Sequence, residues 1–340
     1  MKLVKTFSGI GCLWHFDHVY VKLKKGRLYK IDDLKLILIA EEEIESFTIY
    51  EGYQIYQIVG EPSAIYILNE DGPSQKLLQS ENEDLTISRG LLISGQLPVF
   101  FNQTGDIFPG GMYLIGPDLS IGRVEVPNVY NIQIGQHFFN NTIGSIFSYG
   151  IDHSLNYKLD ISGFGTNVVV HRETGEILSK KSNEIDGELF ASESFLYVPL
   201  QGGQLLAVDA ATGEQKWLWE HDRLGAYGKQ GDIIYKQDGK SLYVIDALNG
   251  DLIKSKRFSE EVILIDFHAS GPIWIYQDVI IVVDVLSGKV CILDILTLNA
   301  LDYFTINKKI PFDLDALTLH EDKLYILDLE NTLYVFEQAL

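Results

Sequence analysis

The segment LLAVDAATGEQKW, from Leu205 to Trp217, contains the pattern that decides the fold. Its apolar first half ends at Asp209, a Thr-Gly pair follows, and the last part ends on the tryptophan. Short apolar runs that flank a glycine-containing turn predict a β-hairpin. Whether this hairpin is a functional site or a structural element depends on whether it is repeated along the chain.

The hairpin is repeated. LYVIDALNG reaches its glycine at Gly250 and NVVVHRETG at Gly175, 37 and 38 residues from the glycine of the first copy. In a later copy, KVCILDILTLN, Asp294 and Thr297 take the same places, and we expect Asn299 to adopt the left-handed backbone that glycine adopts elsewhere. A nearly constant period of this length indicates a repeated supersecondary unit, which here consists of strands.

Weaker copies extend the pattern over residues 18–43 and 53–80 and to the end of the chain. Four-stranded units in radial repetition predict an all-β fold, a single β-propeller domain over residues 1–340. Eight blades fit best if the stretch between positions 69 and 171 contains two units. Because the repeat pattern is weakest in this stretch, seven blades is the alternative. The last unit stops one strand short, so we expect the N-terminal strand MKLVKTFSG to complete it and close the ring.

Residues 205–217 match the pattern Ala-x-Asp-x-x-Thr-Gly-x-x-x-Trp at all five places: Ala207, Asp209, Thr212, Gly213 and Trp217. This stretch resembles the tryptophan-docking repeat of quinoprotein-like (PQQ-type) propellers. The partial copies keep Asp246 and Gly250, Thr174 and Gly175, and Asp294. The resemblance implies that aspartate, threonine and glycine form the turn, and that the tryptophan docks one blade onto the next.

The resemblance does not extend to the quinone. Family dehydrogenases often carry adjacent cysteines and calcium ligands, whereas this sequence has only Cys12 and Cys291 and no D-x-D-x-D-G loop. The fold serves enzymes and binding scaffolds alike. We therefore expect neither a cofactor nor a metal.

The chain carries 47 acidic and 27 basic residues, a net charge of −20. Such a surface repels nucleic acid and anionic lipid. It favours a basic protein partner, and the alternative is a solvated acidic surface that serves only solubility. We expect no secretory or lipoprotein leader, since Lys5 interrupts the N-terminal apolar stretch, and the longest apolar runs are too short to span a bilayer. With only two cysteines as well, we expect a cytoplasmic protein that binds neither nucleic acid nor membranes.

Two regions are candidates for partner binding. The first consists of aromatic residues among glycine, asparagine and proline between positions 95 and 150: Phe100, Phe101, Phe108, Phe138, Phe139 and Tyr149. Aromatic side chains on long loops often anchor interfaces, and the alternative is that they fill enlarged blades. The second is the acidic run of Glu41, Glu42, Glu43 and Glu45, which forms a solvated turn or steers a basic partner.

No catalytic residue is assigned. The sequence lacks the nucleophile-elbow, P-loop and zincin motifs, and His15, Asp17 and His18 of HFDH are expected to form a strand end and turn without metal. The leading hypothesis is a non-enzymatic protein-binding module, in its most concrete form an immunity protein that neutralises a basic bacterial toxin. The alternative is a lyase, hydrolase or quinone-dependent oxidoreductase that uses the central channel.

Overall fold

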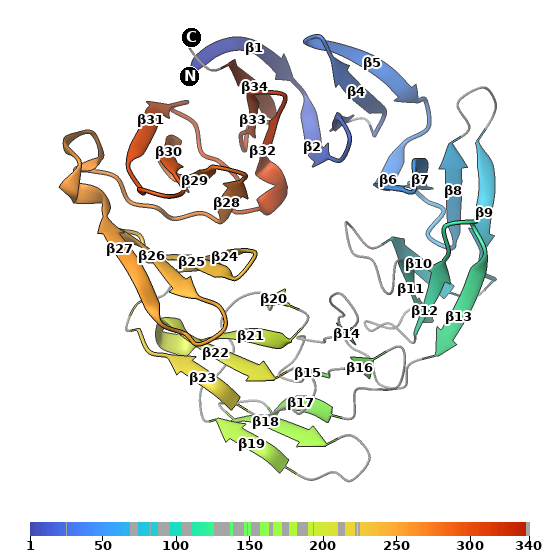
Figure 1. Ribbon diagram of the computed structural model, residues 1–340. Coiled ribbons are helices and arrows are strands. Elements are labelled where there is room, and N and C mark those ends of the chain that lie inside the picture. Colours follow the sequence, from blue (N-terminus) through green and yellow to red (C-terminus); the bar gives the residue numbers. More distant parts are fainter. Residues whose placement is uncertain are drawn as a thin grey trace. The chain divides into compact units, whose positions relative to one another are not determined.

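Figure 1 shows the computed structural model of the chain. The chain forms two compact units, one of Met1–Glu43 with Arg223–Leu340 and one of Ile44–Asp222. It describes residues 1–24, 26–68, 74–81, 83–87, 96–103, 111–125, 137–138, 146–147, 149–150, 157–162, 166–171, 177–181, 190–192, 194–209, 215–221, 223 and 225–337. Over these residues the regular structure is β-strand with four short 3-10 turns, so the all-β prediction is confirmed. None of the helical turns among them is long and apolar enough to cross a membrane.

The first unit contains four four-stranded antiparallel sheets among its described residues. Three of them are consecutive meanders. These are β2 (Ile10–His15), β3 (Val19–Leu23), β4 (Leu28–Asp32) and β5 (Lys35–Ala40); β24 (Ala226–Gln230), β25 (Ile233–Gln237), β26 (Ser241–Asp246) and β27 (Leu252–Arg257); and β28 (Ile273–Tyr276), β29 (Val279–Asp284), β30 (Lys289–Asp294) and β31 (Ala300–Thr305). Antiparallel neighbours joined by short turns are what the alternating apolar runs and glycines predict.

The fourth sheet of this unit joins the two ends of the chain. Strands β32 (Leu317–His320), β33 (Lys323–Leu327) and β34 (Thr332–Glu337) form a meander, and β1 (Lys2–Ser8) is its fourth strand. Strand β1 pairs with β34 from Lys2 opposite Glu337 to Ser8 opposite Thr332, so the termini lie side by side (Figure 1). The N-terminal strand therefore supplies the strand that the last repeat lacks.

The second unit contains four more four-stranded sheets and one two-stranded sheet among its described residues. The first two are β6 (Ile44–Tyr50), β7 (Tyr53–Ile58), β8 (Ala64–Leu68) and β9 (Gln75–Gln79), and β10 (Glu83–Ile87), β11 (Leu97–Gln103), β12 (Gly111–Ile115) and β13 (Ile121–Glu125). The others are β15 (Ile146–Phe147), β17 (Tyr157–Ser162), β18 (Thr166–His171) and β19 (Ile177–Lys181); β20 (Phe190–Ala191), β21 (Phe195–Leu200), β22 (Gln204–Asp209) and β23 (Gln215–Trp219); and the pair β14 (His137–Phe138) and β16 (Tyr149–Gly150).

The repeated aspartate ends the third strand of a sheet and organises the turn to the fourth. Asp246 Oδ1 accepts hydrogen bonds from the amides of Leu248 at 2.8 Å and Asn249 at 3.3 Å. Gly250, four residues after the aspartate, has φ +79° and donates its N–H to the Asp246 carbonyl. The aspartate thus satisfies amides that the strand ladder leaves unpaired, and glycine supplies the left-handed step.

The same turn follows Asp294, and here the prediction for Asn299 is wrong. Thr297 donates both its N–H and its hydroxyl to Asp294 Oδ1, each at 2.6 Å. The residue in the left-handed region is Leu298, with φ +60°, again four residues after the aspartate. Its side chain is buried in the core between two sheets, and this burial offsets the cost of the backbone conformation.

Apolar faces of neighbouring sheets pack against each other within each unit. Leu242 and Val244 of β26 share a cluster with Ile280 and Val282 of β29, and Leu298 belongs to it. A second cluster joins β29 and β30 to β33, and a third joins β2–β5 to β33 and β34. In the second unit the sheets β6–β9 and β10–β13 share such a cluster. Face-to-face packing of successive four-stranded sheets is the packing of propeller blades.

The tryptophan of the complete repeat, Trp217, is buried and packs near a tyrosine of its own sheet. Ala207 lies opposite Trp217 in the ladder, so the small residue makes room for the ring, which lies 5.8 Å from the ring of Tyr197. In the next repeat Lys254 stands at the tryptophan place and donates to the Leu296 carbonyl of the neighbouring sheet. Lys256 also reaches across, to Asn299 Oδ1 at 2.7 Å. Lysine hydrogen bonds therefore join these two sheets where the repeat pattern has a tryptophan.

Candidate functional site

The aromatic residues expected on loops are placed differently. Phe101 lies in strand β11, is only 4% exposed and belongs to the core between the sheets β6–β9 and β10–β13, so it is not an anchor for a partner. Phe100 precedes it in the same strand, and Phe138 and Tyr149 pair with each other in β14 and β16. Phe108 and Phe139 lie outside the described residues, as do Thr174, Gly175, Thr212 and Gly213.

Glu41, Glu42 and Glu43 of the acidic run lie between strands β5 and β6, and Glu45 lies in β6; all four are exposed. Four carboxylates within five residues create a negative potential that extends about one Debye length into solvent, about 8 Å at physiological salt.

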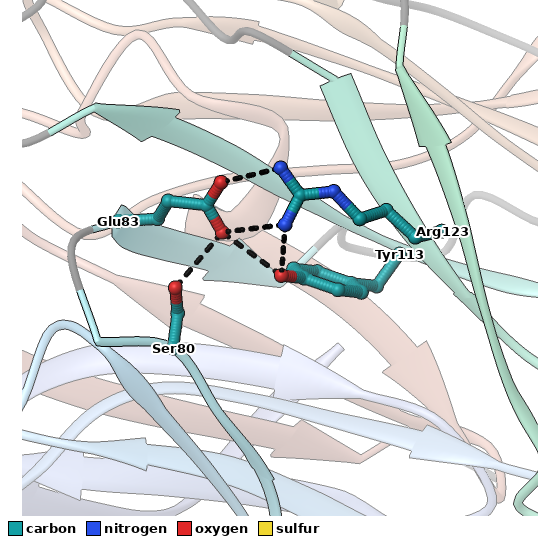
Figure 2. Close-up of polar contacts among 4 residues, drawn as sticks. All are labelled: Ser80, Glu83, Tyr113 and Arg123. Atoms are coloured by element: carbon teal, nitrogen blue, oxygen red, sulfur yellow. Dashed lines mark hydrogen bonds and ion pairs between the residues drawn. The ribbon is translucent and has the colours of Figure 1, made fainter.

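Four polar side chains converge in the second unit, at the sheet β10–β13 (Figure 2). Glu83 of β10 accepts hydrogen bonds at Oε2 from Ser80 Oγ at 2.8 Å and Tyr113 OH at 2.9 Å. Its Oε1 lies 2.7 Å from Arg123 Nη2, and Arg123 Nη1 lies 3.3 Å from Oε2 and 2.8 Å from Tyr113 OH. Arg123 thus binds the carboxylate through both nitrogens, which is the strongest geometry for this pair.

Strand register and ring packing hold this cluster in place. Tyr113 of β12 lies directly opposite Arg123 of β13, and the guanidinium carbon lies 4.3 Å from the centre of the Phe101 ring. Ser80 follows β9, so its hydroxyl connects the sheet β6–β9 to the sheet β10–β13. Two sheets contribute side chains to the cluster, and the Phe101 ring packs against the guanidinium of Arg123.

The electrostatics of the cluster suit a structural role, which is to hold the sheets β6–β9 and β10–β13 together, better than a catalytic one. Burial works to raise the pKa of the Glu83 carboxyl, but hydrogen bonds from Ser80, Tyr113 and Arg123 and the charge of Arg123 outweigh it and hold the pKa below its usual value. Burial and the neighbouring carboxylate raise the pKa of Tyr113. At neutral pH, Glu83 therefore has no proton to donate and its oxygens are already occupied, so it is poorly suited to general acid–base catalysis.

The HFDH segment places His15 at the end of β2, with Asp17 and His18 in the following bend. His15 Nε2 lies 3.2 Å from Nδ1 of His320, which ends β32. Burial and the charge of His320 lower the pKa of His15, while Asp17 raises it. The three histidines thus share one end of two neighbouring sheets of the first unit, although only two of them are close in sequence.

The described residues contain no group of three or more histidine, cysteine, aspartate or glutamate side chains arranged to hold a metal ion. Cys291 is buried in β30, and burial raises the pKa of its thiol to about 12, so it is protonated at neutral pH and is a poor nucleophile.

A feature that the sequence patterns did not single out lies on four connecting loops of the first unit. Large apolar side chains there are 50–70% exposed. We call them the apolar loop strip: Ile263 and Ile265 between β27 and β28, Leu286 between β29 and β30, Phe312 and Leu314 between β31 and β32, and Leu329 between β33 and β34. In the sequence, turn residues or residues that are buried in the structure flank each strip residue. The only sequence signal for its exposure was therefore the alternation of exposed and buried residues within one loop.

No protein-family model matches the chain, and no curated protein matches it significantly in sequence. Solved structures do match. Sqt1 of Saccharomyces cerevisiae is 12% identical with a TM-score of 0.60, over 100% of this chain and 99% of that chain. BamB of Moraxella catarrhalis is 13% identical with a TM-score of 0.53, over 99% and 97%.

A third match is the dihydro-heme d1 dehydrogenase NirN in complex with DHE, 12% identical with a TM-score of 0.51, over 87% of this chain and 67% of that chain. The matched structures are β-propellers. At these identities the likeness shows the fold alone. The chain therefore has a propeller-type fold, and this fold occurs in an enzyme as well as in other proteins.

Proposed function

We propose that the chain is a non-enzymatic protein-binding propeller whose partner is basic. The observation that carries the proposal is the net charge of −20, together with an acidic run that is exposed at all four glutamates. A rigid scaffold with an acidic surface attracts a basic partner over long range and excludes acidic ones. The most concrete form is a cytoplasmic immunity protein that neutralises a basic bacterial toxin.

The architecture that belongs to this proposal is a single closed ring with eight blades, each formed by one of the four-stranded sheets. The pairing of β1 with β34 supports closure by exchange of strands between the termini. Seven blades stays the alternative.

The experiment is affinity capture with the tagged full-length chain from the cytoplasm of its own cells, followed by mass spectrometry and measurement of Kd against salt. We expect a basic protein whose association slows and whose Kd rises as ionic strength increases from about 0.05 to 0.5 M, because added salt screens exposed charges. A partner bound with equal affinity at all salt concentrations would contradict the electrostatic part. A stoichiometric metal or cofactor on the purified protein would favour the enzymatic alternative instead.

A further inference from the structure

The apolar loop strip lies at one end of the sheets of the first unit. In an antiparallel meander the connections alternate between the two ends of the strands. The connections β29–β30 and β33–β34 are therefore at the same end as those that lead from β27 to β28 and from β31 to β32. These are the four loops that carry the strip.

Hydrogen bonds join the four loops in order. Val285 donates its N–H to Ser270 Oγ at 3.1 Å, and Ile310 donates its N–H to the Val285 carbonyl at 2.9 Å. Leu329 then donates to the Lys309 carbonyl, also at 2.9 Å. Hydrogen bonds therefore link each of the four loops that carry the strip residues to the next one.

Buried side chains and a hydrogen bond to the backbone anchor two of these loops. Between β27 and β28, Leu264 and Phe267 are buried, whereas Ile263 and Ile265 are exposed. In the loop between β31 and β32, the carbonyl of Leu314 accepts a hydrogen bond at 2.7 Å from the indole N–H of Trp274, which lies in β28. This bond fixes the turn that follows Phe312. A loop whose backbone is already fixed loses less entropy on binding, which favours affinity.

The same four loops are acidic. Residues 258–272, 284–289, 305–317 and 327–332 contain eight carboxylates and three lysines. The exposed carboxylates are Glu260, Asp266, Asp313, Asp315 and Glu330. Two of the lysines are engaged locally, Lys308 with Glu330 at 2.6 Å and Lys289 with the Asp266 carbonyl at 3.2 Å.

Single exposed leucines are ordinary on a protein surface, but six large apolar side chains on adjoining loops mark an interaction site. We propose that the apolar loop strip is the docking surface for an amphipathic basic segment of a partner protein. Its apolar side chains cover the strip, and its lysines or arginines face the carboxylates on the same loops. This inference rests on the proposed function and specifies its binding surface.

The test uses three synthetic peptides and the full-length chain. One peptide contains lysine and leucine, the second contains lysine and serine with the same charge, and the third contains glutamate and leucine. Fluorescence anisotropy gives Kd for each. We expect the lysine–leucine peptide to bind about tenfold or more tightly than the lysine–serine peptide, and the glutamate–leucine peptide not to bind.

Two variants locate the binding. The strip variant carries Leu286→Ser, Phe312→Ser and Leu329→Ser. The matched control carries Leu248→Ser and Leu296→Ser, which replace exposed leucines at turns on the opposite end of the same sheets. We expect the strip variant to bind the lysine–leucine peptide about tenfold or more weakly than wild type, and the control to bind within about twofold of wild type.

The outcomes separate this inference from the proposed function. Equal affinity of wild type for both lysine peptides, or unchanged binding by the strip variant, overturns the strip as the docking surface and leaves a basic partner in place. Tighter binding of the glutamate–leucine peptide, or no binding of either lysine peptide, overturns the strip and the basic partner together.

Discussion

The Glu83 cluster and the apolar loop strip differ in what their side chains contact. The polar side chains of the cluster bind one another, whereas the apolar side chains of the strip are exposed. In the cluster, Glu83 receives hydrogen bonds from Ser80, Tyr113 and Arg123. In the strip, apolar side chains on anchored loops are in contact with water. Paired polar groups stabilise the fold they belong to, whereas exposed apolar groups gain free energy only when something covers them. The comparison assigns cohesion to the first region and binding to the second.

The largest expected effect contrasts two leucines of one sheet. Leu298 is 1% exposed and Leu286 is 69% exposed, and each follows a turn-forming aspartate. Leu298→Ala should lower the free energy of unfolding by about 3 kcal/mol because it empties a packed core. Leu286→Ala should change it by less than about 0.5 kcal/mol. Urea unfolding measures both.

Leu298→Gly is the control for the backbone at this position. Since φ is +60° there, glycine should recover about 1 kcal/mol relative to alanine. Equal losses for the buried and the exposed leucine would contradict the distinction between the two regions.

The next effect is expected at the cluster. Glu83→Gln removes the charge that Arg123 binds through both nitrogens and should lower the free energy of unfolding by about 2 kcal/mol. Glu81→Gln, an exposed glutamate two residues earlier, should have little effect. Peptide binding by Glu83→Gln should equal that of wild type. Weakened binding without a loss of stability would show that the cluster is a site rather than a structural connection.

A smaller effect should appear in the pH dependence of stability. The pKa of Glu83 is held below 4.5, so near and just below that pH the unfolded chain binds more protons than the folded chain. The contribution of Glu83 is therefore complete above pH 4.5 and is lost as the pH falls through its lowered pKa. Thermal unfolding at a series of pH values should show a shallower acid loss for Glu83→Gln than for wild type. If wild type and Glu83→Gln lost thermal stability equally as the pH falls, the cluster would not contribute to stability in the way described.

The smallest effect on stability is expected for the strip. The three serine substitutions at Leu286, Phe312 and Leu329 replace side chains that are 58–70% exposed, so the free energy of unfolding should change by less than about 1 kcal/mol in total. A large loss would indicate that these side chains support the loops themselves, and the strip would then be part of the fold.

The sequence predicted the repeated unit well and the irregular parts poorly. Alternating runs located the strands that end at Asp209, Asp246 and Asp294, because strand and turn signals are local. Asn299 was assigned the left-handed backbone because asparagine tolerates it. Leu298 adopts it instead, since tertiary burial of the leucine outweighs its local preference.

The candidate site was harder to predict for the same reason. The proline and glycine around Phe101 predict a loop, whereas Leu97–Gln103 is a strand. Its residues Leu97, Val99 and Phe101 face a core. Leu286, Phe312 and Leu329 are far apart in sequence, and only the sheet connections bring their loops together. The exposure of a side chain on a loop depends on what packs under that loop, which one sequence without its fold does not reveal.

The most direct test of the central claim is hydrogen exchange of the full-length chain with and without the lysine–leucine peptide. We predict slower amide exchange in residues 258–272, 284–289, 305–317 and 327–332, with no change at the turns after Asp246 and Asp294 or at the Glu83 cluster. Protection at those turns or at the cluster, with none at the four loops, would contradict the account.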